Sequence, residues 1–422
     1  MVLKKKNLIV VFLLFFAACS PTNNKSVVIH LQSEPSLISG ENIPLNVALE
    51  LPDQFKNTAL NEILVKVQQK GNSSSILDGQ LSHGPDGKIY LWWIAPKIEK
   101  GQVMSWQVTL TKGSREMQKK GFRWKDVPGQ YLDLQFDGRN IIRYVYAYDR
   151  SSPEKIEETN KPFHHIFDFD GKDFITNSPG GLYPHHRGLF IGWQKVECGS
   201  QTFNFWSMEE GVSQKHQKFL QIEAGPVLAV ATAKIDWLDE KAEAVITEER
   251  RVSVFKQPLP TLTLLEFRTK ITPVKCDVNL LGNAEHAGFQ FRAHNDVAIG
   301  YVRGHHEPVP EDKIKCRYFF HKDGIDPKKD FDLPWTALSF DLRGRKYNVQ
   351  HINHPKNPSP TVYSAYRNYG RFGASFNKKI KKRDSLNLIY YIWVVEGETP
   401  SREAFQNMYE KLVNKPTVKI IN

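Results

Sequence analysis

Most of the chain consists of short runs in which apolar and polar residues alternate, with turn residues between the runs. This two-residue period is that of a strand with one buried face, and the longer period of a helix is scarce. Asp137-Gly138 and Asp170-Gly171 are typical hairpin turns between such runs. The pattern therefore predicts an all-β protein built from antiparallel strands.

The strand-like runs fall into two regions. Residues 26–125 contain short strands at regular spacing and predict a small Ig-like β-sandwich. Residues 131–422 are too many for one such sandwich and predict a large antiparallel β-supersandwich of long, curved sheets. Residues 401–413, with Ser401 as the N-cap, predict one C-terminal helix. The charged residues 154–160 are expected to form an exposed loop.

The N-terminus has the pattern of a bacterial export signal. Lys4, Lys5 and Lys6 precede a short apolar stretch, and residues 1–18 form a signal peptide too short for a resident helix, which needs about 20 residues. Small residues before Cys19 resemble a lipobox, which implies acylation of Cys19 after cleavage. Residues 19–25 form a polar tether. We expect a lipid-anchored protein of the bacterial cell envelope, in the outer membrane and facing the periplasm.

Composition narrows the class of partner. The 422 residues are 40% hydrophobic and 12% aromatic, which is ample for a packed core. The net charge of +11 comes from scattered basic residues without a stripe of interleaved aromatics, so nucleic-acid binding is not expected and anionic surroundings or substrates are favoured. Cys198, Cys276 and Cys316 contain no CxxC pair, and in an oxidising compartment one disulfide would leave one thiol, with the pairing open.

One stretch, residues 180–193, concentrates candidate chemistry. Glycines lead into a turn, His185-His186-Arg187 follow, and an apolar strand leaves from Leu189. If the strand alternation extends back to these residues, His185 and Arg187 share one face and His186 takes the other. Such a loop-to-strand junction can present polar groups to a ligand. The alternative is a His-rich turn that is simply exposed to solvent.

A second cluster lies about a hundred residues later. Gln290, Arg292 and His294 would share one face of a strand whose other face is phenylalanine-rich, and His286 comes just before it, next to Glu285. An adjacent carboxylate raises the pKa of an imidazole where the side chains meet. The alternative is a polar strand face open to water. Further clusters contain His354 and Asn357 between prolines, and Arg371 between glycines.

These clusters resemble one known family. The matching segments are residues 183–189, 204–206, 285–293, 333–337, 354–358 and 369–373. They are similar to the DUF6807 family, also labelled PmoA-like or "methane oxygenase PmoA", over residues 131–398. The resemblance implies an exported protein of polysaccharide-degrading bacteria. Residues 194–197 depart from the acidic or glycine-rich segment of many members. A copper site on a free N-terminal histidine is not expected, because maturation would leave acylated Cys19 first. The fold also resembles the galactose-mutarotase-like supersandwich.

Three functions follow from these residues. The first is a carbohydrate-active enzyme of epimerase, lyase or hydrolase type, which needs no cofactor. His185 or His186 and His286 would be its general acid and base. Its carbohydrate ligand would be bound by Arg187, Gln290, Arg292, His294, His354, Asn357, Arg371 and Trp206. The second is a non-catalytic glycan-binding lipoprotein, with Trp193, Trp206 and Trp335 as stacking platforms. The third is a metal enzyme that holds a divalent ion on His185, His186 and His286 or His294. All three require the two histidine clusters to converge in space.

Overall fold

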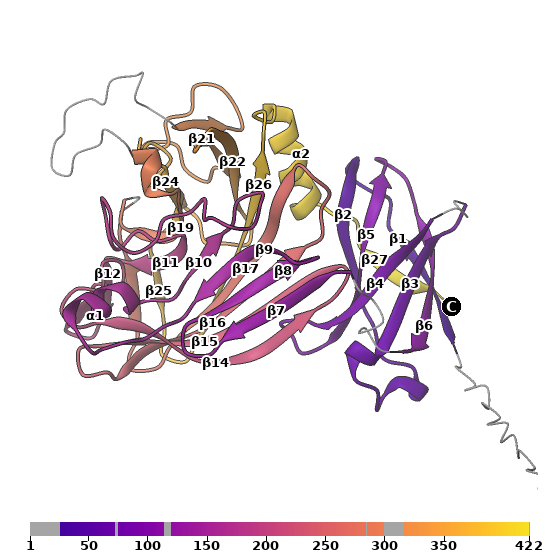
Figure 1. Cartoon of the computed structure of the whole chain (residues 1–422), viewed down its shortest axis with the longest axis horizontal. Coiled ribbons are helices and arrows are strands. Elements are labelled where there is room, and N and C mark those ends of the chain that lie inside the picture. Colours follow the sequence, from indigo (N-terminus) through magenta and orange to yellow (C-terminus); the bar gives the residue numbers. More distant parts are fainter. Residues whose placement is uncertain (1–25, 72–74, 114–119, 284, 299–315, 422) are drawn as a thin grey trace, which may run out of the picture.

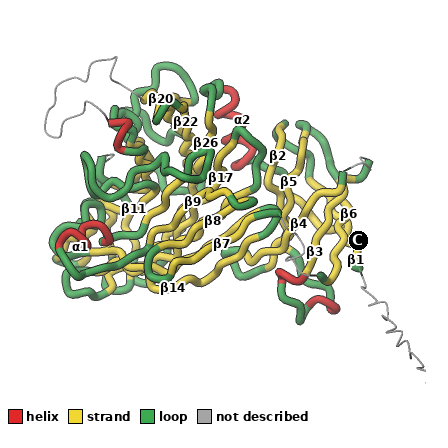
Figure 2. The backbone as a smooth tube through the Cα atoms, in the orientation of Figure 1, coloured by secondary structure: helices red, strands yellow, loops and turns green. Residues whose placement is uncertain are grey.

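The structure, a computed structural model, describes residues 26–71, 75–113, 120–283, 285–298 and 316–421. Strands make up most of these ranges (Figure 2), which confirms the predicted all-β class. The predicted signal peptide, Cys19 and the tether lie outside the described residues. Within the described part, no helix has the length and apolar character needed to cross a bilayer.

The small domain is one curled antiparallel sheet. Among the described residues its strands pair in the order β2-β5-β4-β3-β6-β1-β27, and the edge strands β2 and β27 lie together. Trp93 and Trp106 pack in its core with ring centroids 5.1 Å apart. The sheet also contains the last strand of the chain, so the C-terminus lies in this domain (Figure 1). Its strands are β1 (Val27–Ser33), β2 (Gly40–Ala48), β3 (Ile63–Gln69), β4 (Ile76–His83), β5 (Ile89–Ile98), β6 (Ser105–Lys112) and β27 (Val418–Ile421), with short 3-10 turns at Asp53–Phe55 and Leu60–Glu62.

The large domain is a sandwich of two eight-stranded antiparallel sheets in the described part of the chain. The first sheet, which carries the histidine clusters, has the order β23-β24-β19-β11-β10-β9-β8-β7. Its strands are β7 (Phe122–Val127), β8 (Tyr131–Phe136), β9 (Arg139–Val145), β10 (Phe163–Ile166), β11 (Leu189–Trp193), β19 (Ala287–Arg292), β23 (Val362–Tyr363) and β24 (Arg371–Ser375). The predicted Asp137-Gly138 turn joins β8 to β9, and both residues have the positive φ that this tight hairpin needs.

The second sheet consists of longer strands in the order β14-β15-β16-β17-β26-β22-β21-β20. Phe289 of the first sheet stacks on Phe267 and Tyr390 of the second, with ring centroids 4.1 and 5.0 Å away, so the core lies between the sheets. The strands are β14 (Ser213–Ala224), β15 (Leu228–Leu238), β16 (Ala244–Phe255), β17 (Thr261–Pro273), β20 (Cys316–Phe320), β21 (Trp335–Leu342), β22 (Arg345–Asn353) and β26 (Leu386–Glu396). A 3-10 helix at Asn295–Ala298 follows β19.

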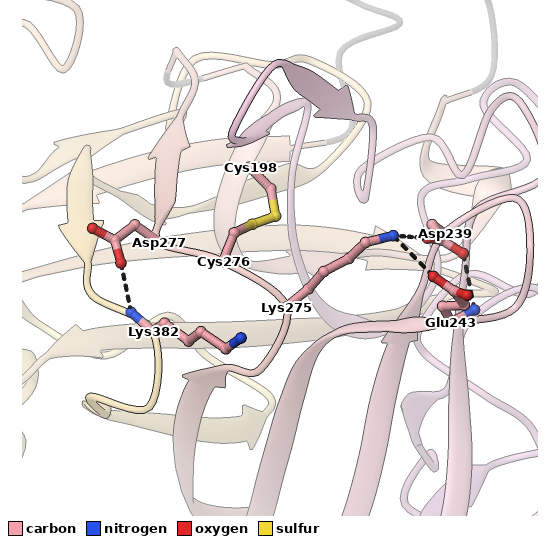
Figure 3. The surroundings of a disulfide bond; sticks show 7 residues. All are labelled: Cys198, Asp239, Glu243, Lys275, Cys276, Asp277 and Lys382. Atoms are coloured by element: carbon pink, nitrogen blue, oxygen red, sulfur yellow. Dashed lines mark hydrogen bonds and ion pairs between the residues drawn. A yellow bond between two sulfur atoms is a disulfide. The ribbon is translucent and has the colours of Figure 1, made fainter.

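A small four-stranded sheet, counted over the described residues, contains one end of the disulfide Cys198–Cys276, which joins β12 to the connection between β17 and β18 (Figure 3). Its strands are β12 (Lys195–Cys198), β13 (Gln201–Phe203), β18 (Val278–Leu281) and β25 (Lys378–Ile380). The Cα atoms of the two cysteines are 5.6 Å apart, and Cys316 is a buried free thiol. Beside the disulfide, the Lys275 ammonium donates to Asp239 and Glu243 at 2.6 and 3.1 Å. The Cys198–Cys276 bond is the cysteine pairing that the sequence left open.

Two α-helices occur in the described ranges. α2 (Arg402–Val413) begins after Ser401, whose hydroxyl accepts from the Ala404 amide at 3.1 Å, as predicted. α1 (Pro153–Thr159) occupies residues expected to form an exposed loop, so that prediction is wrong. Ser152 caps α1, since its hydroxyl accepts from the Lys155 amide, and Pro153 suits its first turn. A helix this short gives little periodic signal in the sequence.

The two domains meet along the outer face of the second sheet (Figure 1). The Gln80 side chain accepts hydrogen bonds from the Val227 and Leu228 amides, both at 3.1 Å, and Trp92 packs on Phe255. The observed boundaries differ from the predicted ones at both ends of the large region. β7 belongs to the large domain although it begins before residue 125, and β27 returns to the small domain.

Candidate functional site

The His-His-Arg stretch forms a tight turn rather than the start of a strand. The His186 amide donates to the Tyr183 carbonyl at 2.9 Å, and β11 begins only at Leu189. Strand alternation therefore does not apply, and the prediction that His185 and His186 face opposite ways is wrong. Their ring centroids are 4.3 Å apart. The Asn177 side chain holds the turn by donating to the His186 carbonyl at 2.9 Å.

Sheet pairing brings the second cluster beside the first. β11 pairs with β19 so that Phe190 lies opposite Gln290, and β19 pairs with β24 so that Arg292 lies opposite Arg371. Gln290 and Arg292 share the face turned away from the core, as predicted, while Phe289 points into the core. Residues that are far apart in the sequence therefore meet on one side of this sheet.

Trp206 lies at the centre of the cluster. Its ring centroid is 5.5 Å from His186 and 6.0 Å from His286, and the Arg371 guanidinium lies 5.4 Å from its ring centre. Gly192 lets the Phe205-Trp206 backbone pack closely against β11, because a Cβ at residue 192 would lie 2.1 Å from the Phe205 carbonyl oxygen. Trp206 is fully buried, whereas His185 and His286 are only half-buried. The two histidines therefore form the accessible layer above a buried tryptophan and arginine.

Four buried cations surround these rings. Lys161, Arg187, Arg292 and Arg371 are each at most 1% exposed. None of them has a carboxylate within ion-pair distance among the residues that the structure describes. The buried Arg250, by contrast, is bonded twice to Glu248. Because an unpaired buried charge is costly, a cluster of four needs an explanation beyond packing.

The bonding of these cations shows which donors a ligand could use. Lys161 donates to the Trp206 carbonyl at 2.5 Å. Arg292 donates through Nη1 to the Ala293 and Tyr369 carbonyls, and its Nε and Nη2 atoms have no hydrogen-bond partner among the described residues. Arg371 uses Nε and Nη1 on Tyr369, Gln290 and Ser364, so its Nη2 makes no hydrogen bond with a described residue. The Arg292 guanidinium thus retains two donors that no described residue uses.

The environment keeps the imidazoles neutral. Burial, and then the nearby charges of Lys161 and Arg187, lower the pKa of His185 to about 2. Burial and the charge of Arg371 lower the pKa of His186 well below its ordinary value, and neither ring nitrogen of His186 has a hydrogen-bond partner in the described part of the chain. The same two causes lower the pKa of His286. Glu285 does raise the pKa of His286, as expected, but burial and Arg371 outweigh it, and Glu285 itself pairs with Arg367.

Some predicted site residues lie away from the cluster around Trp206, and others use their donors on backbone carbonyls. Arg187 donates all its bonds to backbone carbonyls, those of Pro184 (3.0 Å), Glu158 (3.0 Å) and Glu157, so it anchors the end of α1. His294 lies beyond the end of β19, beside Asp296 and Arg343 rather than the central rings.

The third predicted cluster belongs to the second sheet. Asn357 bonds the Ile389 backbone in both directions, at 2.7 and 2.8 Å. His354 lies near Glu266 and Arg268 on that sheet. The structure therefore does not bring His354 or Asn357 to the cluster around Trp206, because β22 leads away from β11 and β19. Lys161 is a member that sequence reasoning missed, since a single lysine before a proline carries no recognisable pattern.

The described residues contain no group of three or more His, Cys, Asp or Glu side chains arranged to hold a metal ion. The turn at Pro184 does bring His185 and His186 together, but their unpaired neighbours are cations rather than carboxylates. The donor set therefore does not fit a divalent cation.

The fold and the site define a class: an all-β sandwich protein with a cluster of neutral histidines and buried arginines on one sheet. The chain belongs to the DUF6807 family, described as a family of unknown function, whose model matches residues 131–410. No curated protein matches the chain significantly. Solved structures of heparan sulfate lyase HepC from Pedobacter heparinus are similar to it at low level. The mutant lyase has 9% identity and a TM-score of 0.35, and the unmutated enzyme has 10% and 0.28. Each comparison covers 66% of this chain, which spans only 37% of the lyase's length.

Proposed function

We propose that the chain is a carbohydrate-active enzyme of the cell envelope that acts on a sugar bearing a carboxylate. The observation that carries this proposal is the set of four buried cations without carboxylate partners around neutral imidazoles. A guanidinium binds a carboxylate through two parallel hydrogen bonds, and the Nε and Nη2 donors of Arg292 are used by no described residue. Arg371 is the group whose charge acts on all three histidines, so the carboxylate would bind beside them.

The neutral imidazoles supply the base. His185 and His286 are half-buried and unprotonated at working pH, so either accepts a proton from a bound sugar. The acidic proton is the one on the carbon next to the carboxylate, since the arginine neutralises the charge that develops on the carboxylate. The imidazole takes the proton, and the electron pair moves into the carboxylate. Elimination is completed when the imidazolium gives this proton to the departing oxygen substituent, which leaves as an alcohol. Epimerisation is completed when water gives a proton to the other face of the carbon and the imidazolium returns its own proton to the resulting hydroxide.

Neither alternative function has an observation in its favour. Trp193, Trp206 and Trp335 are fully buried, so none offers a ring face for a sugar to stack on. The metal alternative lacks a suitable ligand set in the described ranges. Location in the envelope rests on the N-terminal sequence. The Cys198–Cys276 disulfide supports it, because structural disulfides are typical of exported proteins.

The test is proton exchange on acidic sugars. Oligosaccharides of galacturonate, glucuronate and mannuronate are incubated with the protein in D₂O, and deuterium at the carbon next to the carboxylate is followed by NMR together with unsaturated products. We expect exchange or elimination with at least one of them, and a loss of about 10²–10⁴-fold in His185→Gln or His286→Gln. His354→Gln, which changes a histidine outside the cluster, is the matched control and keeps the activity. The proposal fails if no acidic sugar reacts, or if both site variants react like the control.

A further inference from the structure

A cavity lies on the second sheet, where the small domain meets the large one. Its volume is about 360 Å³. The outer face of the long-stranded sheet forms its floor, and the turn between β4 and β5 forms one wall. None of the residues around Trp206 lines it. The lining residues used below are Leu220, Gln221, Thr232, Arg251, Lys270 and Asn387.

The floor is built from two rows of side chains that run across the strands. In one row Thr232 lies opposite Arg251, and Arg251 lies opposite Arg268. In the other, Lys270 lies opposite Glu249 on one side and Asn387 on the other. Two like charges directly opposite each other on neighbouring strands are destabilising. The Arg251–Arg268 pair is therefore not explained by stability of the sheet.

Arg251 is also a buried cation without an acidic partner. It is 7% exposed, and it donates to Gln221, to Thr232 at 3.5 Å and to the His83 carbonyl at 2.7 Å. All three acceptors are neutral, and no carboxylate of the described residues lies within ion-pair distance of it. Arg268, by contrast, is bonded twice to Glu266. Lys270 is likewise ion-paired with Glu249 at 3.0 Å, so Arg251 is the cation of the described cavity floor whose charge no carboxylate pairs.

The small domain is fixed at this place by polar bonds. The Ser82 hydroxyl donates to Glu223 at 2.6 Å, and the His83 Nδ1 atom lies 2.6 Å from the same carboxylate. With the bond from Arg251 to His83, these contacts hold the 84–87 turn over the sheet. Without the small domain, the cationic rows would be an open sheet face. The domain contact therefore converts a flat surface into a cavity.

We propose that this junction cavity binds an anionic sugar residue. The carboxylate would lie against Arg251, Arg268 and Lys270, and Asn387, Gln221 and Thr232 offer hydrogen bonds to hydroxyl groups. Leu220, 46% exposed, offers an apolar surface for the C–H face of the ring. The volume lies at the low end of small-ligand sites, which span about 300–1,000 Å³, so one or two sugar residues fit. The site is separate from the proposed catalytic one and gives the small domain a role in recognition.

The experiment combines hydrogen exchange with titration on the full chain, using digalacturonate as the probe and lactose as a neutral disaccharide. We expect digalacturonate to slow exchange in the 84–90 segment, and lactose to leave it unchanged. Lys270→Gln and Arg268→Gln should weaken digalacturonate binding at this segment at least about tenfold. Lys218→Gln removes an exposed lysine on the same sheet face outside the cavity, and it should bind like the unchanged protein.

Three outcomes would overturn the proposal: no protection of the 84–90 segment, equal binding by Lys270→Gln and Lys218→Gln, or equal protection by lactose. The two proposed sites are separable in the same assay. A His185→Gln variant, altered only in the proposed catalytic site, should keep the junction protection. Loss of catalysis in that variant therefore leaves the junction proposal standing, and a failure at the junction leaves the catalytic proposal untouched.

Discussion

We predict that the protein loses stability in mildly acidic solution, because two of its histidines are buried in their neutral form. His165 is 3% exposed, its ring stacks on Phe174 at 3.8 Å, and its Nδ1 atom lies 3.0 Å from the Thr176 hydroxyl. His351 is fully buried between the Tyr363 hydroxyl and the Phe289 carbonyl, at 3.2 and 3.3 Å. Burial lowers the pKa of each imidazole to about 3.

The sign follows from comparing the folded and unfolded chains. An unfolded histidine binds a proton below its ordinary pKa of about 6.5, whereas these two stay neutral in the folded protein until about pH 3. Their contribution to stability is therefore complete above pH 6.5 and is lost progressively as the pH falls to about 3. At pH 4.5 each histidine lowers the free energy of unfolding by about 2.7 kcal/mol, and the pair by about 5 kcal/mol. That is comparable with the whole stability of many domains, about 5–15 kcal/mol.

The assay is urea unfolding at pH 7.5, 5.5 and 4.5. His351→Gln keeps a polar side chain but cannot take up a proton in the unfolded state. It should be less stable than the unchanged protein at pH 7.5, and the gap should narrow by about 2.7 kcal/mol at pH 4.5. His165→Gln should behave alike. Tyr363→Phe is the control, because it removes a partner of His351 and leaves the imidazole, so its pH dependence should match that of the unchanged protein.

The reasoning is refuted if the unchanged protein has the same unfolding free energy at pH 7.5 and 4.5. It is also refuted if both glutamine variants keep the full pH dependence. Either result would mean that the folded protein accommodates protonated imidazoles in its interior. The same burial argument keeps His185 neutral, so the proposed base would lose its physical support as well.

Four further predictions follow from particular contacts. If His185 is the base, kcat/KM for proton exchange should show no inflection near pH 6.5 between pH 8 and 5.5, and an inflection there would contradict the lowered pKa. Cys276→Ser should destabilise the protein by up to about 4.5 kcal/mol in urea, because the disulfide closes a 78-residue separation, and dithiothreitol should not affect the variant further. Arg187→Gln should cost about 3 kcal/mol and speed hydrogen exchange in α1, since the bonds to the carbonyls at its end are lost; unchanged exchange there would argue against the anchoring role. Cys19→Ser should abolish incorporation of labelled palmitate, and retained label would refute lipidation at that residue.

Local patterns explain which parts of the fold were predictable. The two-residue period, the Asp137-Gly138 turn and the Ser401 cap are decided by neighbours in sequence, and all appear as expected. The proximity of the two histidine clusters was also predicted. The first cluster comes just before β11 and the second lies at β19, and these two strands pair in one antiparallel sheet. What the sequence could not give was the register that sets Arg292 opposite Arg371.

The wrong predictions involve partners that are distant along the chain. The role of Arg187 depends on α1, a seven-residue helix whose final carbonyls need donors, and this helix was not predicted. His354 and Asn357 carry the same residue types as a binding site, but β22 belongs to the other sheet. β27 pairs with β1 from the opposite end of the chain. Residue type alone does not distinguish a ligand-binding side chain from one that satisfies a buried backbone.

The buried cations around His185 would make its pKa depend on whether a carboxylate is bound. In the free protein, burial and then the charges of Lys161, Arg187 and Arg371 hold the His185 imidazole neutral and make it a weak base. A bound carboxylate would neutralise part of that field, so the pKa of His185 would rise only when the proposed substrate is present. The imidazole would thus gain basicity at the moment it needs to take a proton. On this reasoning, kcat should depend on pH with a higher apparent pKa than kcat/KM, because kcat reports the bound state and kcat/KM the free protein.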